Sequence, residues 1–174
     1  MSASSSDRPI SVVLCDDVSE MRKLLRYALE TDPRMRVVGE AGDGREGARV
    51  IAELQPDVVL LDLSMPEMDG LETIPEISSS APETAIVVFS GFAAERMRDP
   101  ALSSGADRYI EKGAPLDEII STVREVADER RGEDGPGAGG HKSPRPSPGP
   151  LSAWLAWVGA ALGSTSHAHP AFAG

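Results

Sequence analysis

Short apolar runs alternate with helix-like segments up to about residue 130, and this alternation constrains the fold more than any other feature of the sequence. The segments between the runs repeat apolar residues every three or four positions, which is the spacing of one helix face. A strand followed by a helix and a further strand forms a parallel crossover unit. The sequence therefore predicts an α/β protein with a doubly wound, five-stranded parallel sheet and helices on both faces. The predicted strands are Ile10–Cys15, Arg36–Ala41, Val58–Asp62, Ala85–Ser90 and Arg108–Glu111.

The predicted helices differ in how clearly their ends are marked. Ser19 is the expected N-cap of the first helix, and Asp32-Pro33 is its expected end. Proline lacks the N–H that an inner helix position needs, so we expect Pro75 to shorten or bend the third helix and Asp99-Pro100 to interrupt the fourth. The expected apolar face of the first helix is Met21, Leu24, Leu25, Ala28 and Leu29, and that of the last is Leu116, Ile119, Ile120, Val123, Val126 and Ala127.

The charge is strongly acidic and unevenly distributed. The net charge is −11, and all 28 acidic residues lie at or before Asp134. An acidic domain disfavours nonspecific binding to nucleic acid, which depends on Lys and Arg neutralising phosphates. The single cysteine, Cys15, cannot form an internal disulfide and is typical of small core packing in a reducing compartment.

The composition divides the chain into four parts. Residues 1–8 are polar, are expected to be disordered and lack the apolar core of a signal peptide. Residues 9–130 form the expected domain, and residues 131–150 a disordered linker rich in Gly and Pro. Residues 151–174 are an apolar tail, either loosely ordered or a short helix that docks on a partner, on the domain or at a membrane surface. Its apolar stretch Leu151–Leu162 is shorter than the ~20 residues of a membrane span, so we expect a soluble, cytoplasmic protein.

Acidic residues follow two of the predicted strands. Asp16 and Asp17 follow the first strand, and Asp62 closes the third. The carboxyl ends of the first and third strands lie beside each other at the switch point of such a sheet, where these proteins carry out their chemistry. Three crowded carboxylates need a cation or a proton between them, and hard oxygen ligands suit Mg²⁺. Taken alone, Asp16 or Asp17 is equally compatible with a helix N-terminal role.

Two further strand ends carry groups that complement a phosphoryl group. Ser90 closes the fourth strand with a hydroxyl, and Lys112 follows the fifth as the only lysine between residues 24 and 141. A phosphoryl group on Asp62 would need its oxygens neutralised, and a metal, an ammonium and a hydroxyl together do that. Tyr109, on the fifth strand, is by default a half-buried packing residue.

Over residues 9–130 this pattern resembles the receiver domain of two-component response regulators, the CheY-like superfamily. The resemblance implies a flavodoxin-like strand order, 2-1-3-4-5, and a phosphorylation-controlled switch rather than an enzyme. No single motif in the matching set is specific, but the whole set is. The matching residues are Asp16-Asp17, Asp62, Met65-Pro66, Asp69-Gly70, Ser90-Gly91, Tyr109 and Lys112-Gly113.

The resemblance also implies roles. Asp62 would accept a phosphoryl group from a sensor histidine kinase or a phosphotransfer protein. Mg²⁺ would be bound by Asp62, Asp17 and the Ser64 backbone carbonyl, with Asp16 acting directly or through water. Lys112 would pair with the phosphate. Ser90 would move toward the phosphate and Tyr109 inward behind it, so that the surface near the fourth helix and fifth strand reports the change.

The output remains open at this point. Val37–Gly44 and Gly91-Phe92 resemble regulators that carry a helix-turn-helix DNA-binding domain, but the residues after the last helix hold no amphipathic helix pair and almost no basic residues. DNA binding through this chain is therefore not expected. Three outputs stay open: control of an unknown protein partner, phosphoryl transfer to another protein, and descent from a truncated or atypical transcriptional regulator. So does phosphorylation-dependent homodimerisation.

Three other kinds of protein compete with this interpretation. Gly42 to Gly47 match the G-x-G-x-x-G dinucleotide fingerprint, but a fold starting there would leave Asp16, Asp17 and Lys112 unexplained. A phosphohydrolase with an aspartate nucleophile would place a second acid two residues later, where Ser64 stands. A flavin module would bring its phosphate to Asp16 and Asp17, which would repel it.

Overall fold

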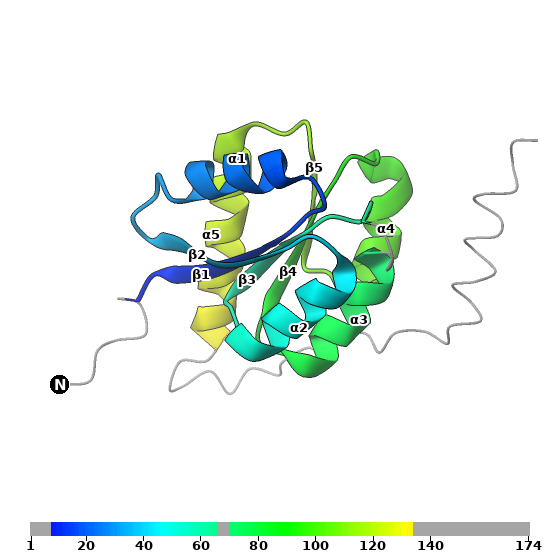
Figure 1. Ribbon diagram of the computed structural model, residues 1–174, viewed down its shortest axis with the longest axis horizontal. Helices are drawn as coiled ribbons and strands as arrows, with labels where there is room; N and C mark the ends of the chain where they lie inside the picture. Colours follow the sequence, from blue (N-terminus) through cyan, green and yellow to red (C-terminus); the bar gives the residue numbers. More distant parts are fainter. Residues whose placement is uncertain (1–7, 66–69, 134–174) are drawn as a thin grey trace, which may run out of the picture.

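The computed structural model describes residues 8–65 and 70–133, and these form one five-stranded sheet flanked by five helices (Figure 1). The strands are β1 (Ile10–Cys15), β2 (Met35–Ala41), β3 (Val58–Leu61), β4 (Ala85–Ser90) and β5 (Arg108–Glu111). The helices are α1 (Ser19–Leu29), α2 (Gly44–Leu54), α3 (Gly70–Ser80), α4 (Ala94–Ser104) and α5 (Leu116–Glu133). All neighbouring strands are parallel, in the order β2-β1-β3-β4-β5, which confirms the predicted fold.

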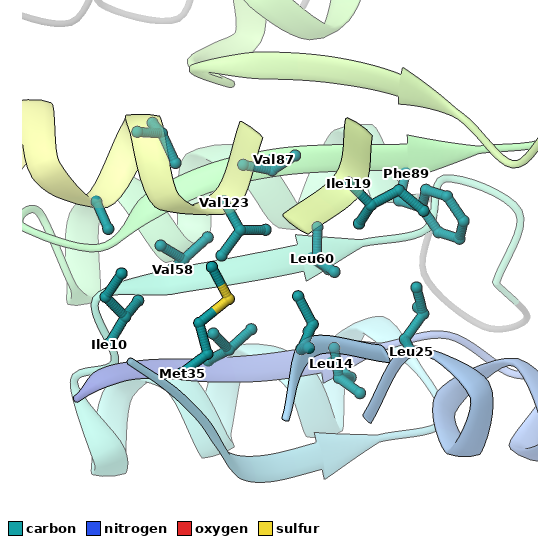
Figure 2. Close-up of a cluster of buried hydrophobic side chains, with 14 of the residues drawn as sticks. Ile10, Leu14, Leu25, Met35, Val58, Leu60, Val87, Phe89, Ile119 and Val123 are labelled. Atoms are coloured by element: carbon teal, nitrogen blue, oxygen red, sulfur yellow. The ribbon is translucent and has the colours of Figure 1, made fainter. Parts of the chain in front are cut away.

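Side chains of the central strands point alternately into two cores, one on each face of the sheet. Residues such as Val12 and Leu14 of β1 join a cluster under α1 and α5, whereas Val13 and Cys15 join a cluster under α2, α3 and α4. Figure 2 shows part of the first cluster, where Ile119 and Val123 of α5 lie over the side chains of the central strands. Because β3 and β4 are buried along their whole length, their sequences are continuously apolar rather than alternating.

The edge strand β2 contains one irregularity. The register between β1 and β2 shifts between Val12 and Val13, which pair with Val37 and Gly39. A Cβ atom at Gly39 would lie 2.8 Å from Leu54 Cδ1, so glycine allows α2 to approach the strand closely.

Two expectations for α1 are wrong. Ser19 is the first helical residue rather than the N-cap, and its hydroxyl bonds to Glu20. Val18 occupies the N-cap position, and its N–H donates to Asp16 Oδ1 at 2.9 Å, so Asp16 organises this turn instead. Leu24 was expected on the buried face but is 46% exposed, because the helix presents Leu25, Ala28 and Leu29 to the core instead.

Neither proline ends its helix. Pro75 lies inside α3 and Pro100 inside α4, so the expected interruption at Asp99-Pro100 is wrong. Each proline removes only one backbone donor. The adjacent side chains compensate through burial, since Ile74, Ile77 and Ala101 are fully enclosed.

The last helix extends to Glu133, beyond the expected domain limit at residue 130. Its final turn is anchored by Arg131, which donates to the carbonyl oxygens of Arg8 and Pro9, each at 3.0 Å. The predictions for residues 1–7, for the remainder of the linker and for the tail at 151–174 lie outside the described residues. Within residues 8–65 and 70–133 no helix has the length and apolar character needed to cross a bilayer.

Candidate functional site

The three predicted carboxylates meet at the carboxyl edge of the sheet. Asp16 follows β1 and Asp62 follows β3, and these strands are hydrogen-bonded neighbours. The Asp62 N–H donates to the Cys15 carbonyl at 2.8 Å, which fixes the two strand ends against each other. One oxygen from each of Asp16, Asp17 and Asp62 lies within 4.8 Å of the others. Asp16 and Asp62 are buried, whereas Asp17 is exposed and opens the pocket to solvent.

Lys112 brings the positive charge into this acidic pocket. Its Nζ lies 2.8 Å from both Asp62 Oδ2 and Asp16 Oδ2. The backbone holds it there, since the Lys112 N–H donates to the Ser90 carbonyl at 2.8 Å. Burial alone would lower the pKa of Lys112, but the hydrogen bonds and charges of Asp16 and Asp62 outweigh burial and raise this pKa. One ammonium therefore pairs with two of the three carboxylates in the pocket.

The remaining oxygen atoms fit a hard divalent cation. Asp16 Oδ2 is buried, and within the described residues its charged contact is the Lys112 ammonium at 2.8 Å. Among the described residues, Asp62 Oδ1 accepts a hydrogen bond only from the Ser64 N–H, at 3.0 Å. Three carboxylates beside one ammonium leave an excess of negative charge, which Mg²⁺ binding would relieve. The Ser64 carbonyl, predicted as a further ligand, follows Asp62 closely, but its role as a ligand stays a prediction.

Ser90 and Tyr109 lie on neighbouring strands beside the pocket. Ser90 is fully buried at the end of β4, and its Oγ accepts the Phe92 N–H at 3.3 Å. The Tyr109 hydroxyl donates to the Phe92 carbonyl at 2.8 Å, so both side chains contact the start of the β4–α4 loop. Burial is the main reason that the pKa of Tyr109 is raised. Tyr109 is half-buried against the second core, as packing alone would predict.

The structure adds two residues that the sequence did not indicate. Arg22 on α1 donates from Nη1 to the Asp16 carbonyl at 2.5 Å, and its Nε donates to Glu40 Oε2 at 3.0 Å. Glu40 also accepts from Arg26. A lone arginine on an amphipathic helix is typical of a solvated face, so no local signal in the sequence distinguishes Arg22.

Some matching residues lie elsewhere. Pro66 and Asp69 of the motif after Asp62 are outside the described residues, whereas Met65 is buried. The segment Gly42–Gly47 includes the connection after the edge strand β2 and the first turn of α2, and does not lie at the crevice between β1 and β3 where a dinucleotide would bind. Gly47 packs against Cys15 instead, which removes the main support for a dinucleotide site.

Comparison with known proteins agrees with this arrangement. The family profile described as the response regulator receiver domain matches residues 12–124. An uncharacterised transcriptional regulatory protein of Bacillus subtilis, YhcZ, is 41% identical over 113 residues, which is 65% of this chain and 53% of that protein. A protein-glutamate methylesterase/protein-glutamine glutaminase of Koribacter versatilis is 40% identical over 123 residues, which is 70% of this chain but only 33% of that protein. The chain thus spans about half or less of these relatives, and the similarity to the methylesterase is confined to one third of that enzyme.

Solved structures of receiver domains match a similar share of this chain. The receiver domain of NarL from Mycobacterium tuberculosis superimposes with a TM-score of 0.67 at 31% identity, covering 70% of this chain and 98% of that one. The response regulator domain of Thermotoga maritima CheB gives a TM-score of 0.66 at 30% identity, with the same coverage. With its sheet order, its acidic pocket and this match to the family, the chain belongs to the receiver domains of two-component response regulators.

Proposed function

We propose that this protein is a phosphorylation-controlled switch in which Asp62 is the phosphoacceptor. A phosphohistidine on a sensor histidine kinase or a phosphotransfer protein is the proposed donor. In the transfer the donor's P–N bond breaks, a P–O bond to Asp62 forms, and the electron pair stays on the imidazole nitrogen. The observation that supports this most strongly is the meeting of Asp16, Asp17, Asp62 and Lys112 at one edge of the sheet.

Each residue of the pocket has a separate proposed task. Asp62 and Asp17, together with the Ser64 carbonyl, would hold Mg²⁺, and Asp16 would bind it directly or through water. The bound ion would neutralise charge on the carboxylates and on the incoming phosphoryl group. The Lys112 ammonium, which already contacts Asp62, would shift to an oxygen of the new phosphoryl group.

Ser90 and Tyr109 are the proposed route from the pocket to the surface. The Ser90 hydroxyl would turn toward the phosphoryl group and give up the Phe92 N–H that it now accepts. Tyr109 donates to the carbonyl of the same Phe92, so a change at Ser90 would reach this ring directly. The ring borders a depression of about 400 Å³ between α4, β5 and α5, lined in part by Leu102, Ile110 and Thr122. A change there would alter the surface offered to an output partner.

A slow switch fits this site better than rapid turnover. The position two residues after Asp62 is Ser64, which cannot act as a general base toward water. We therefore propose that the aspartyl phosphate persists and that the protein is not an enzyme in its own right. A cytoplasmic location is part of the proposal, and the free, buried Cys15 fits a reducing compartment. The output partner and phosphorylation-dependent homodimerisation stay open, and a truncated or atypical transcriptional regulator is the alternative.

Phosphorylation with a small donor tests this proposal. The protein is incubated with Mg²⁺ and acetyl phosphate, and its intact mass and two-dimensional amide spectrum are recorded. We expect one phosphoryl adduct on the wild type and on Asp128→Asn, a control at an exposed carboxylate of α5. We expect no adduct on Asp62→Ala. An adduct that survives Asp62→Ala, or no adduct on the folded wild type, would overturn the assignment.

A further inference from the structure

The short turn between β1 and α1 carries two of the three carboxylates, so its backbone position determines the geometry of the acidic pocket. Three hydrogen bonds within the described residues hold Asp16 in this turn. Its N–H donates to the Ala41 carbonyl at 3.1 Å, and its Oδ1 accepts the Val18 N–H. Its carbonyl oxygen accepts from Arg22 Nη1 at 2.5 Å. Among the described residues, two side chains outside the turn hold Asp16: Arg22 binds its backbone carbonyl, whereas the Lys112 ammonium pairs with its carboxylate.

Arg22 is itself held at a second point. Its side chain is 18% exposed, and its Nε donates to Glu40 Oε2 at 3.0 Å. The planar guanidinium therefore joins β2, through Glu40, to the Asp16 carbonyl. A planar group with fixed donor directions, fastened on one side, limits the movement of whatever it binds on the other.

We propose that Arg22, held in place by Glu40, is a positioning residue that sets the Asp16–Asp17 turn for cation binding. This inference rests on the magnesium binding contained in the proposed function. Groups that do not touch a metal but orient its ligands commonly change metal affinity by about 10- to 100-fold when removed. Arg22 binds the carbonyl oxygen of Asp16, which belongs to the peptide group that joins Asp16 to Asp17. Loss of Arg22 would therefore loosen the position of both carboxylates.

Arg26 provides a matched control on the same helix. It lies four residues later, and its Nε donates to Glu40 Oε1 at 2.8 Å, so it shares the partner of Arg22. Its Nη1 donates to the Val37 carbonyl at 3.2 Å rather than to the pocket. Removing Arg26 thus removes an equivalent ion pair between α1 and β2 without touching Asp16.

The test measures magnesium affinity and folding stability separately. Wild type, Arg22→Ala, Arg22→Lys and Arg26→Ala are titrated with Mg²⁺ by calorimetry and by amide spectra, and each is melted without the metal. We expect Arg22→Ala to weaken magnesium binding about 10- to 100-fold. We expect Arg26→Ala to bind like the wild type, although both variants melt somewhat lower. Arg22→Lys should recover part of the loss, because its ammonium can reach the carbonyl but cannot hold Glu40 at the same time.

The amide spectra give a second readout that does not need the metal. In Arg22→Ala, but not in Arg26→Ala, the resonances of Asp17 and Val18 should shift before any Mg²⁺ is added. Equal loss of affinity in the two variants, or wild-type affinity in a folded Arg22→Ala, would overturn the inference while leaving the proposed function intact. A wild type that binds no Mg²⁺ at all would overturn both.

Discussion

At the scale of single residues, Asp57, just before β3, is a carboxylate away from the pocket that several partners hold in place. It accepts the Ser11 N–H at 2.8 Å and the Ser11 hydroxyl at 2.6 Å, and Arg131 and Arg8 pair with it. Burial would raise the pKa of Asp57, but the bonds from Ser11 and Arg131 outweigh burial and lower it. Asp57 thus joins the start of β1 to the end of α5.

This lowered pKa predicts a specific loss of stability in acid. Because the folded pKa lies below the unfolded value, the ionised carboxylate stabilises the protein above about pH 4, and this contribution disappears as the pH falls through the folded pKa. We expect Asp57→Asn to lower the free energy of unfolding at pH 7 by about 1–3 kcal/mol. The difference from the wild type should shrink in acid, as urea unfolding at several pH values would show.

Asp128→Asn is the matched control for this prediction. Its carboxylate pairs with Arg34 but is 50% exposed, and such pairs contribute only about 0–1 kcal/mol. A difference between wild type and Asp57→Asn that stays constant from neutral to acid pH would contradict the argument.

The residues of the pocket were predictable to different degrees. Asp16, Asp17 and Asp62 could be placed together from sequence because the carboxyl ends of parallel strands share one edge. Arg22 and Glu40 could not, because they meet only after α1 packs beside β2, and nothing in either segment marks the pair. Asp57 was missed for the same reason, since its partner Arg131 lies far away in the sequence, in α5.

At the scale of elements, the contact between α2 and β1 is closer than side chains normally allow. A Cβ atom at Gly47 would lie 2.8 Å from Cys15 Sγ, whereas its next contacts would be ordinary. Cys15 is buried, and burial, as the largest cause, raises the pKa of its thiol to about 12. The thiol therefore acts here as a packing group rather than as a nucleophile.

This contact predicts coupling between the two positions. Gly47→Ala should destabilise the protein by about 1–3 kcal/mol through overpacking, even though alanine favours helix formation. Cys15→Ala removes the obstructing sulfur, so the double variant should be more stable than the sum of the two single changes predicts. Chemical denaturation of all four proteins measures this coupling. Effects that add within about 0.3–0.5 kcal/mol would contradict it.

The strands were easier to predict than the helix ends. A continuous apolar run such as Ala85–Ser90 indicates a strand that is buried on both faces. The five strands were therefore predicted with at most small errors at their ends. The start of α1 depended instead on which side chain reaches the turn, and Asp16 does so in place of Ser19. The helices around Pro75 and Pro100 persist through tertiary burial, which local patterns do not reveal.

At the scale of the whole molecule, we expect the charge of the pocket to link folding stability to the proposed metal binding. Three carboxylates face one ammonium in a chain whose net charge is already −11. A cation that binds only the folded state stabilises it, by about 2.7 kcal/mol when its concentration is 100 times its dissociation constant. We expect Mg²⁺ to raise the melting temperature in a saturable way, and Asp17→Asn to reduce this effect strongly.

Ionic strength is the necessary control for that experiment, because an acidic protein gains stability from any salt that screens repulsion. Sodium chloride at matched ionic strength should give a smaller shift that does not saturate, and the same shift in wild type and Asp17→Asn. Equal shifts from the two salts would mean that screening, not a bound ion, accounts for the stabilisation.

The anchoring of Arg131 to the carbonyls of Arg8 and Pro9 has a practical consequence. It brings residues 8 and 133 to the edge of the sheet opposite the acidic pocket, roughly 20 Å away for a strand of this length. A fluorophore or fused reporter attached at either position would lie away from the acidic pocket, where the proposed phosphodonor would bind. A conformational change at the pocket would therefore reach such a reporter through the sheet or through α5, and not by direct contact.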